Sequence, residues 1–318
     1  MSMGNGDVSM GGSAPRMLTV EETPTTKKDR AASYAFLMPT VILILILSIF
    51  PLFFSLGLSF MSWDLSRLEG GVRFIGLQNF ATLFSDGRFW NDAKNTVYFV
   101  GGAVALQYFL GLGLALLLNQ EIHFRRFFRV IFLMPMMLTP AAVGYLGRML
   151  FNESMGPIND IIKHLGLPVV PWLSNSRMAM PTLILLDTWE WVPFITIVLL
   201  AGLQSLPPEV FESATVDGAN DWQILRYIMF PMLAPVSITV ILIRALEAFK
   251  LFDIVVVMTG GGPGTATETV TMYAYTVGMR SGNLGYASTI AYSLLVMVIV
   301  FSMIFLNSLR GRAAAAEG

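Results

Sequence analysis

The sequence predicts an all-α membrane protein that crosses the bilayer six times. Of its 318 residues, 55% are hydrophobic and 13% are charged, whereas soluble domains carry about 25% charged residues. Six apolar stretches approach the roughly 20 residues that a helix needs to cross a bilayer core. Because lipid offers the backbone no hydrogen-bond partners, stretches of this length are expected to be helical.

The six predicted spans differ in their polar content. The first, second and last contain no charged residue, whereas the fourth contains Asp187 and Glu190 and the fifth contains several charges. Pro135 and Pro140 fall inside the third span, where proline breaks or kinks a helix. The predicted spans cover residues 34–60, 95–118, 129–150, 181–203, 232–258 and 285–308.

Basic residues close to the span ends predict the orientation of the chain. They precede the first span, occupy the short loop between the second and third spans, and follow the last span. These bases are Lys27, Lys28, Arg30, Arg125, Arg126, Arg129, Arg310 and Arg312. Short cytoplasmic loops carry an excess of lysine and arginine, so both termini are expected in the cytoplasm. The loops at 61–94, 151–180 and 259–284 are then expected on the outside.

The ends of the chain are predicted to be tails around one transmembrane domain at 34–310. Residues 1–33 are rich in Gly, Ser, Thr and charges and lack an apolar face, which is typical of a disordered cytoplasmic tail. Residues 311–318 are expected to form a short cytoplasmic tail. The first apolar stretch is too long and too deep in the chain for a secretory signal, so we expect it to be a retained span.

Composition also excludes several classes of function. The chain has no cysteine and two histidines, which removes thiol chemistry and makes a metal site unexpected. The net charge is −1, and without a basic field no nucleic-acid partner is expected. Membrane lipid is the partner that the composition predicts.

Residues 204–231 form a polar segment between the fourth and fifth spans with helix signals of its own. The prolines at 207–208 suit a helix start, since the first turn needs no proline N–H. Gly218 permits a turn with positive φ, and Asn220 or Asp221 can cap a second helix. The pattern predicts two short cytoplasmic helices joined by a turn.

The same segment resembles the EAA loop of permease subunits from binding-protein-dependent ABC importers. The resemblance rests on Glu212-Ser213-Ala214, Asp217-Gly218-Ala219, Ile228 and Pro231. Ser213 replaces an alanine and Phe230 a leucine of the family pattern, and both replacements preserve residue character. The resemblance implies a type I ABC importer permease fold, in which six transmembrane helices carry a cytoplasmic coupling helix-turn-helix.

In this family the first short helix docks on a separate ATPase subunit, and the resemblance implies the same role here. Small residues would permit close approach, and acidic residues would anchor the helix. The implied ATPase-coupling residues are Glu212, Ser213, Ala214, Asp217, Gly218 and Ala219. The alternative interpretation is an ordinary amphipathic hairpin in the cytoplasm.

Further fragments resemble the carbohydrate branch, in particular the larger subunit of maltose-type permeases. Phe252-Asp253 followed by the TGGGP sequence at 259–263 matches one signature. Trp189, Pro193-Phe194 and the AGLQ sequence at 201–204 match a second signature, and the resemblance covers about residues 90–310.

This resemblance implies ATP-driven import of a carbohydrate across the bacterial cytoplasmic (inner) membrane. The cargo would be a mono-, di- or oligosaccharide, or a glycerol phosphate. The implied partners are a second, different permease subunit, an ABC ATPase dimer that holds ATP and Mg, and an extracytoplasmic sugar-binding protein.

The triple glycine has two interpretations. A P-loop requires Gly-x-x-x-x-Gly-Lys-Ser/Thr, and the chain contains no such string. We therefore expect a non-catalytic subunit that binds no cofactor itself. The segment is expected to form a tight turn outside the membrane. The alternative is a contact with the binding protein through Gly260, Gly261, Gly262 and Pro263.

Polar residues inside the spans are candidates for the substrate path. Arg244, Glu247, Lys250 and Asp253 recur every three residues in the fifth predicted span. Charges in a membrane are costly and face protein or water, so this row either lines the path or fixes helix packing. A second cluster contains Asp187, Trp189, Glu190 and Trp191, where a carboxylate can accept sugar hydroxyls and an indole can pack on a sugar ring. The alternative for Trp191 is an anchor at the membrane interface.

Two other classes of function remain as alternatives to the importer. An ion-driven secondary transporter could carry protons on Glu247 or Asp253, and it would work without ATP. A membrane enzyme is not expected, because the sequence contains no arrangement of nucleophile, base or metal ligands.

Overall fold

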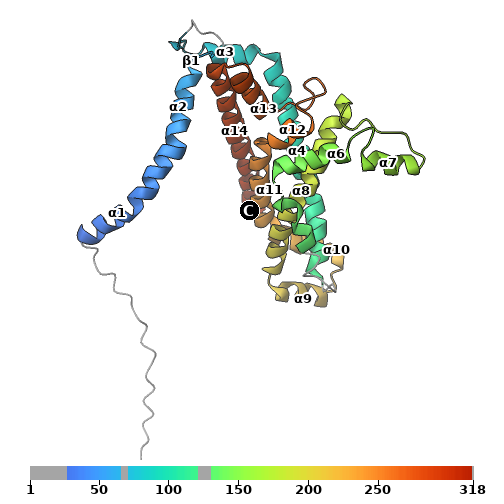
Figure 1. Cartoon of the computed structure of the whole chain (residues 1–318). Coiled ribbons are helices and arrows are strands. Elements are labelled where there is room, and N and C mark those ends of the chain that lie inside the picture. The colour runs from blue at the N-terminus through green and yellow to red at the C-terminus, as the bar shows by residue number, and fades with distance from the viewer. Residues whose placement is uncertain (1–26, 66–70, 121–129, 317–318) are drawn as a thin grey trace, which may run out of the picture. The chain divides into compact units, whose positions relative to one another are not determined.

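The computed structural model describes residues 27–65, 71–120 and 130–316 and consists mainly of helices (Figure 1). The chain divides into two compact units, residues 1–53 and 54–318. The first unit contains α1 (Lys27–Ile44), the π-helical turn η1 (Leu45–Ile49) and the beginning of α2 (Phe50–Ser59). Helix α1 begins at Lys27, so the last residues of the predicted tail are helical, and the apolar span starts at Tyr34 as predicted. Residues 1–26 and the bases at 125, 126 and 129 lie outside the described residues.

The second unit is a helical bundle with one small hairpin, in which β1 (Met61–Ser62) pairs antiparallel with β2 (Arg73–Phe74). Its helical elements are α3 (Gln78–Ser85), α4 (Gly87–Asn119), a helix at Val130–Met137 that ends in η2 (Pro135–Met137), α6 (Pro140–Leu150), α7 (Pro157–His164), α8 (Ser176–Gln204), α9 (Pro208–Val216), α10 (Asp221–Gln223), η3 (Ile224–Met229), α11 (Phe230–Phe249), α12 (Asp253–Met258), α13 (Val270–Tyr275), η4 (Thr276–Arg280) and α14 (Leu284–Ala316).

The predicted membrane spans are confirmed in number when a bent pair is counted as one span. Among the described residues five helices are long and apolar enough to cross a bilayer. The sixth consists of Val130–Met137 and α6, which meet at an angle of 100°. The bend lies between Pro135 and Pro140, as the helix-breaking property of proline predicts. Helix α14 continues to Ala316, so the predicted C-terminal tail at 311–318 is largely helical.

Two long helices begin earlier than their apolar stretches because polar residues cap them. Asp86 Oδ1 accepts hydrogen bonds from the backbone N–H groups of Arg88 and Phe89, at 2.9 and 3.4 Å, and starts α4. Asn175 Oδ1 accepts the N–H of Arg177 at 2.8 Å and starts α8. Such caps satisfy backbone donors that have no partner within the helix.

The fifth predicted span is broken near one end. Helix α11 ends at Phe249 and α12 begins at Asp253, so the predicted single helix over 232–258 is wrong. At the break, the hydroxyls of Thr269 and Thr271 donate to the Leu251 carbonyl at 3.0 and 2.5 Å. Side chains from a later segment thus satisfy backbone that the helix leaves unpaired.

The other end of this span is continuous where a separate helix was predicted. Helix α10, η3 and α11 form one uninterrupted helix, Asp221–Ala248. The six-residue π-helical stretch η3 directly precedes the helical turn that contains Pro231. Because proline lacks an N–H and crowds the preceding turn, a local π-helical adjustment allows the helix to continue.

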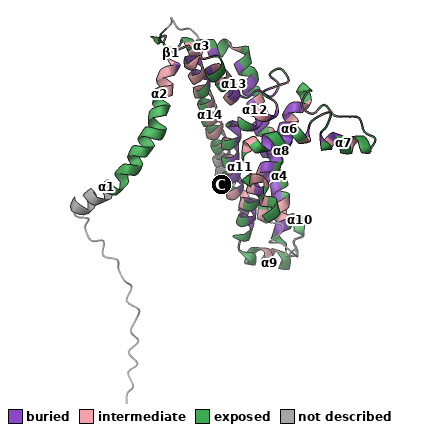
Figure 2. Ribbon diagram, viewed as in Figure 1, coloured by how far each residue is buried: buried purple, intermediate pink, exposed green. Residues whose placement is uncertain are grey.

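The core of the second unit lies along α4, α8 and α11, where Figure 2 shows most of the buried residues. Helices α4 and α8 pack along much of their length, and α11 contacts both. At one end of this unit lie α3, β1 and α13, and at the other lie α9 and α10 (Figure 1). The functional candidates are distributed between these two ends and the interior.

Candidate functional site

A partly polar cavity of about 260 Å³ lies among α6, α8, α11 and α12, and we call it the polar cavity. Five of the six predicted path residues line it, which are Glu190, Arg244, Glu247, Lys250 and Asp253; Trp189 does not. The complete lining is Pro140, Asp187, Glu190, Trp191, Arg244, Glu247, Ala248, Lys250, Leu251, Phe252, Asp253 and Ile254.

Arg244 is the centre of a buried polar network that joins three helices. Its Nε donates to Gln107 Oε1 in α4 at 2.7 Å, and its terminal nitrogen forms an ion pair with Asp187 in α8. Gln107 Nε2 also donates to Asp187 Oδ2 at 2.7 Å, and all three residues are buried. Since a buried charge is tolerated when it is paired and hydrogen-bonded, this network fixes α11 against α4 and α8.

Trp191 forms an aromatic wall of the polar cavity. The Arg244 guanidinium carbon lies 5.0 Å from the centre of the Trp191 ring, a cation–π geometry. Trp189 is 45% exposed and lies outside the cavity, so it does not line the cavity with the other five predicted path residues. Position 191 lies one helical turn after Asp187 and shares its face, which explains why Trp191 lines the cavity beside Asp187.

The remaining carboxyl groups of the polar cavity differ in their pairing. Glu247 and Lys250 pair at 2.7 Å near the surface. Glu190 is 1% exposed, and its Oε2 has no hydrogen-bond partner within the described part of the chain. Asp253 is exposed at the start of α12. The break after Phe249 separates Asp253 from the helix that carries Arg244 and Glu247, so the predicted row does not continue along one helix.

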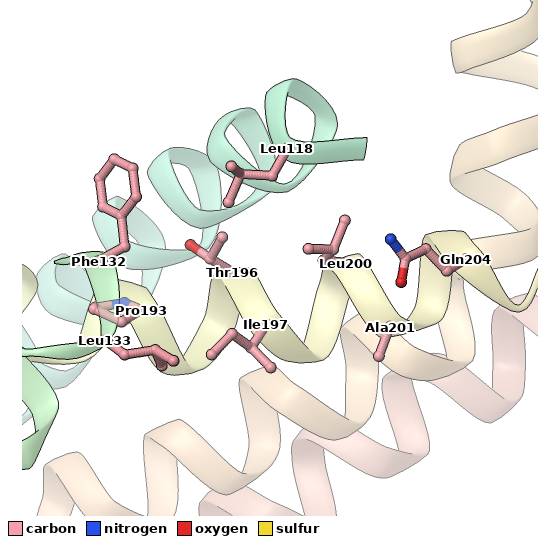
Figure 3. Close-up of a pocket in the computed structure, with 9 residues that line it drawn as sticks. All are labelled: Leu118, Phe132, Leu133, Pro193, Thr196, Ile197, Leu200, Ala201 and Gln204. Carbon is pink, nitrogen blue, oxygen red and sulfur yellow. The ribbon is translucent and has the colours of Figure 1, made fainter. Parts of the chain in front are cut away.

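A second, apolar cavity of about 260 Å³ lies between α4, Val130–Met137 and the second half of α8 (Figure 3). Phe132, Leu133 and Pro193 lie at one end of it, and Gln204 lies at the other. Its lining also contains Leu118, Thr196, Ile197, Leu200 and Ala201. The lining contains no ionisable side chain, which distinguishes this cavity from the polar cavity.

Residues 208–223, which we call the elbow, contain all six predicted coupling residues. Helix α9 starts with Pro208 in its first turn and ends in a glycine turn, where Gly218 has φ +83°. The N–H of Ala219 donates to Ala214 O at 3.0 Å, and that of Gly218 to Thr215 O at 3.1 Å. This pair of bonds is a Schellman motif, so the predicted turn with positive φ is confirmed.

The elbow is closed by local contacts and exposed to solvent. Asn220 and Gln223 form a reciprocal capping box, with both hydrogen bonds at 2.9 Å, which confirms the predicted cap. Glu212, Ser213, Asp217 and Gly218 are exposed, Ala214 and Ala219 are partly buried, and the Val216 side chain is 87% exposed. The arrangement can present a stiff helix to a second protein.

The glycine-rich segment at 259–264 forms a compact loop at the opposite end. Thr267 Oγ1 donates to Gly262 O at 2.7 Å and lies 2.8 Å from Thr259 Oγ1. Gly261 adopts φ +89° and is buried, whereas Gly260 is exposed. Gly262 and Pro263 line a surface groove of about 400 Å³ beside Arg148 and Glu153. The tight turn is confirmed; Gly260 and Gly264 are exposed, and Gly262 and Pro263 line the groove.

Polar contacts that the sequence did not predict fasten this loop region to α4. Arg88 forms a two-point ion pair with Glu268, with both distances 2.8 Å, and Asn95 Nδ2 donates to Thr265 O and Glu268 O. The hydroxyls of Tyr273 and Tyr286 donate to Asp86 Oδ2 at 2.6 and 2.5 Å. We call the set Asp86, Arg88, Asn95, Thr265, Glu268, Tyr273 and Tyr286 the clasp.

Long apolar helices around a partly polar cavity, with an exposed helical elbow at one end, define a multi-pass membrane protein of the transport class. Residues 107–313 match the family described as binding-protein-dependent transport system inner membrane component. The chain belongs to this family and has the type I ABC importer permease fold. Members are membrane subunits of transporters, and the predicted resemblance is thereby confirmed.

Several relatives extend the similarity over most of the chain. It is 35% identical over 267 residues to a probable ABC transporter permease of Sinorhizobium fredii, covering 84% of this chain and 86% of the relative. It is 32% identical to a trehalose/maltose transport system permease protein of Thermococcus litoralis, covering 88% and 94%. A sulfoquinovosyl glycerol transport system permease protein of Agrobacterium fabrum is also 32% identical, covering 89% and 91%.

A solved structure agrees with the fold. A chain of the bacterial alginate ABC transporter, in complex with a periplasmic protein that holds an alginate pentasaccharide, superimposes with a TM-score of 0.77. The two chains are 25% identical, and the match covers 87% of this chain and 93% of the other.

Proposed function

We propose that this chain is one of two different permease subunits of an ATP-driven importer for saccharides. Membership of the binding-protein-dependent family supports the transport role. One relative is named for trehalose/maltose transport and one solved structure is of an alginate transporter, and both names support a saccharide cargo. The observation on which the ATP-driven part depends is the exposed elbow, which is closed by its own caps and leaves Glu212 and Val216 free to contact another protein.

The proposed energy source is an ABC ATPase dimer that binds ATP and Mg and receives α9. Small residues at 214, 218 and 219 allow backbone to approach the partner closely, and Glu212 and Asp217 offer acceptors to its donors. An extracytoplasmic sugar-binding protein delivers the cargo to the opposite end. Alternation between two states requires that ATP and cargo bind those states with different affinities.

The continuous helix Asp221–Ala248 provides a mechanical link between the elbow and the polar cavity. Its 28 residues extend about 42 Å at the usual helical rise of 1.5 Å per residue. Arg244 lies near the far end, where it binds Asp187 and faces Trp191. Movement of the elbow would therefore be transmitted to the wall of the cavity without a flexible joint.

The same proposal gives the orientation of the chain in the bacterial inner membrane. The elbow end and both termini face the cytoplasm, and Gly260, with the groove at Gly262 and Pro263, faces the binding protein. Because the natural chain has no cysteine, single cysteines test this directly. A membrane-impermeant thiol reagent added to intact cells should label Lys163→Cys in α7 and spare Val216→Cys in α9, and the reverse pattern would contradict the orientation.

The test of function is uptake by the reconstituted transporter with a variant of the elbow. Glu212→Arg combined with Gly218→Trp should abolish ATP-dependent sugar uptake and co-purification of the ATPase, while the amount of permease in the membrane stays unchanged. Lys163→Glu, a charge reversal on exposed α7, is the matched control and should behave as the wild type.

Two outcomes would contradict the proposal. Persistence of both uptake and ATPase binding in the double variant would refute docking through the elbow. Uptake by this chain alone in ATP-free vesicles would instead indicate an ion-driven transporter.

A further inference from the structure

Family membership leaves the charge of the cargo open. One relative is named for trehalose/maltose, whose sugars are neutral, and a solved neighbour belongs to a transporter for the acidic polysaccharide alginate. The charges of the residues around the polar cavity therefore indicate which kind of saccharide this chain accepts.

Carboxyl groups outnumber cations in the polar cavity. Its lining contains four acidic residues and two basic ones. The Arg244 cation forms an ion pair with buried Asp187, and the Lys250 cation forms an ion pair with Glu247. Among the described residues, Glu190 and Asp253 take part in no ion pair. Among its described lining residues, the cavity thus has no free cation that could bind an anionic ligand. Its two carboxyl groups outside ion pairs can accept hydrogen bonds from ligand donors.

Glu190 is the carboxyl group whose surroundings indicate a ligand. It lines the polar cavity, it is 1% exposed, and its Oε2 has no hydrogen-bond partner in the described residues. A buried polar atom without a partner is costly, and a sugar hydroxyl in the cavity would remove that cost by donating to it. Trp191, on the same helix and in the same lining, offers a ring face for the apolar side of a sugar.

We infer that the polar cavity accepts saccharide units without an anionic group and rejects sugar acids, with Glu190 as the residue that determines this specificity. A carboxylate or sulfate on the sugar would face Glu190 and Asp253, and like charges placed together cost several kcal/mol. This inference rests on the proposed function, since it concerns the cargo of the same site.

Direct binding to the assembled transporter tests the inference. The permease pair and ATPases are purified together without the binding protein, so that selectivity comes from the permease. Equilibrium dialysis then compares trehalose with trehalose oxidised to a carboxylate at one C6, which differs in charge and hardly in size. The wild type should bind the carboxylate sugar at least about tenfold more weakly, a difference of 1.4 kcal/mol.

Glu190→Gln separates charge from shape. The amide occupies the same space and still accepts a hydroxyl, so trehalose binding should stay within about threefold of wild type. The penalty on the carboxylate sugar should shrink by about tenfold, or 1.4 kcal/mol. Asp160→Asn, which removes an exposed carboxylate from α7, is the matched control and should leave the ratio unchanged.

The possible failures are distinguishable. Equal or tighter binding of the carboxylate sugar by the wild type overturns the inference, as does an unchanged ratio in Glu190→Gln, and both leave the proposed importer intact. Absence of binding and of ATP-driven uptake for both sugars, and for a panel of other neutral and acidic saccharides, would reject a saccharide cargo, and the inference would fall with the proposed function.

Discussion

The clasp and the elbow stabilise opposite ends of the second unit by different means. In the clasp, residues far apart in sequence are joined, and Arg88 and Glu268 lie 180 positions apart. In the elbow, the hydrogen bonds of the Schellman turn and the capping box connect residues within five positions of one another. The clasp therefore holds separate segments in place, whereas the elbow holds only its own shape.

This difference matches the tasks that the two ends would have in the proposed importer. Tertiary ion pairs restrict relative motion of the segments that they join, so the loop end keeps a fixed surface for an incoming protein. A locally closed elbow can move as one body with the long helix that follows it. Variants at the two ends should therefore affect different measurements.

The largest effect on stability is expected at the clasp. Arg88→Met leaves Glu268, which is 3% exposed, as a buried and unpaired carboxylate, a change that costs about 2–3 kcal/mol for a partner that is itself partly exposed. Thermal unfolding in detergent should start several degrees lower. Arg177→Met, at an exposed arginine in the first turn of α8, should change stability little.

Adding Glu268→Gln to Arg88→Met sharpens this prediction. Because the added change removes the stranded charge, the double variant should recover at least half of the lost stability. No recovery, or an equal loss in Arg177→Met, would show that the ion pair does not fasten the loop to α4.

An intermediate effect is expected at the turn of the elbow. Gly218→Val places a branched side chain at φ +83°, and since no atom lies within 4 Å of the added Cβ, the cost is backbone strain of about 1–2 kcal/mol. Apparent affinity for the ATPase should fall up to roughly tenfold, while thermal unfolding of the permease stays near wild type. Gly218→Asn, which tolerates this conformation better, should weaken binding less.

A smaller and more local effect is expected at the cap of α10. Asn220→Ala removes the side chain that accepts the Gln223 N–H, which costs about 1 kcal/mol. Hydrogen exchange of the first backbone amides of α10 should speed up by about fivefold, the factor that corresponds to this free energy. Exchange in the clasp should not change, and Asn220→Asp should preserve the cap.

The smallest effect concerns the pH response of the clasp. Burial raises the pKa of Asp86, but hydrogen bonds from Tyr273, Tyr286 and two backbone N–H groups outweigh it, and the net pKa is lowered from its ordinary 3.8. A lowered carboxyl pKa contributes stability that is complete above the ordinary pKa and is lost as pH falls through the lowered one. The difference in melting temperature between wild type and Asp86→Asn should thus stay constant from about pH 5 to 8 and shrink below about pH 4.

The elbow could be predicted from the sequence because its determinants are local. Pro208, Gly218 and Asn220 act within their own helical turns, and each takes the predicted role. The long apolar spans were predictable for the same reason, since length and composition alone require helices in lipid.

The parts that could not be predicted depend on distant residues. Where α11 ends at Phe249, the hydroxyls of Thr269 and Thr271 donate hydrogen bonds to the Leu251 carbonyl, and no pattern within the span contains that information. The clasp likewise depends on Arg88 meeting Glu268, which only the packing of α4 against the loop region brings about.

The polar cavity was predicted in part. Charge composition identified Glu190 and Arg244, since ionisable residues in spans face protein or water. Charge composition could not show that Arg244 is paired with Asp187 and hydrogen-bonded to Gln107. Nor could it show that Trp191, and not Trp189, lines the cavity. Side-chain pairing between helices decides which charges remain available to a ligand.

Docking of α9 on an ATPase is most directly tested by site-specific cross-linking. Single cysteines are introduced at Val216 in the elbow and at Lys163 in α7, into a chain that has none of its own, and a short bifunctional reagent is added to the assembled transporter. We expect a covalent product between Val216→Cys and the ATPase subunit, and none with Lys163→Cys. Cross-linking of the ATPase through Lys163→Cys, or its absence at Val216→Cys in a transporter that still hydrolyses ATP and imports sugar, would contradict this expectation.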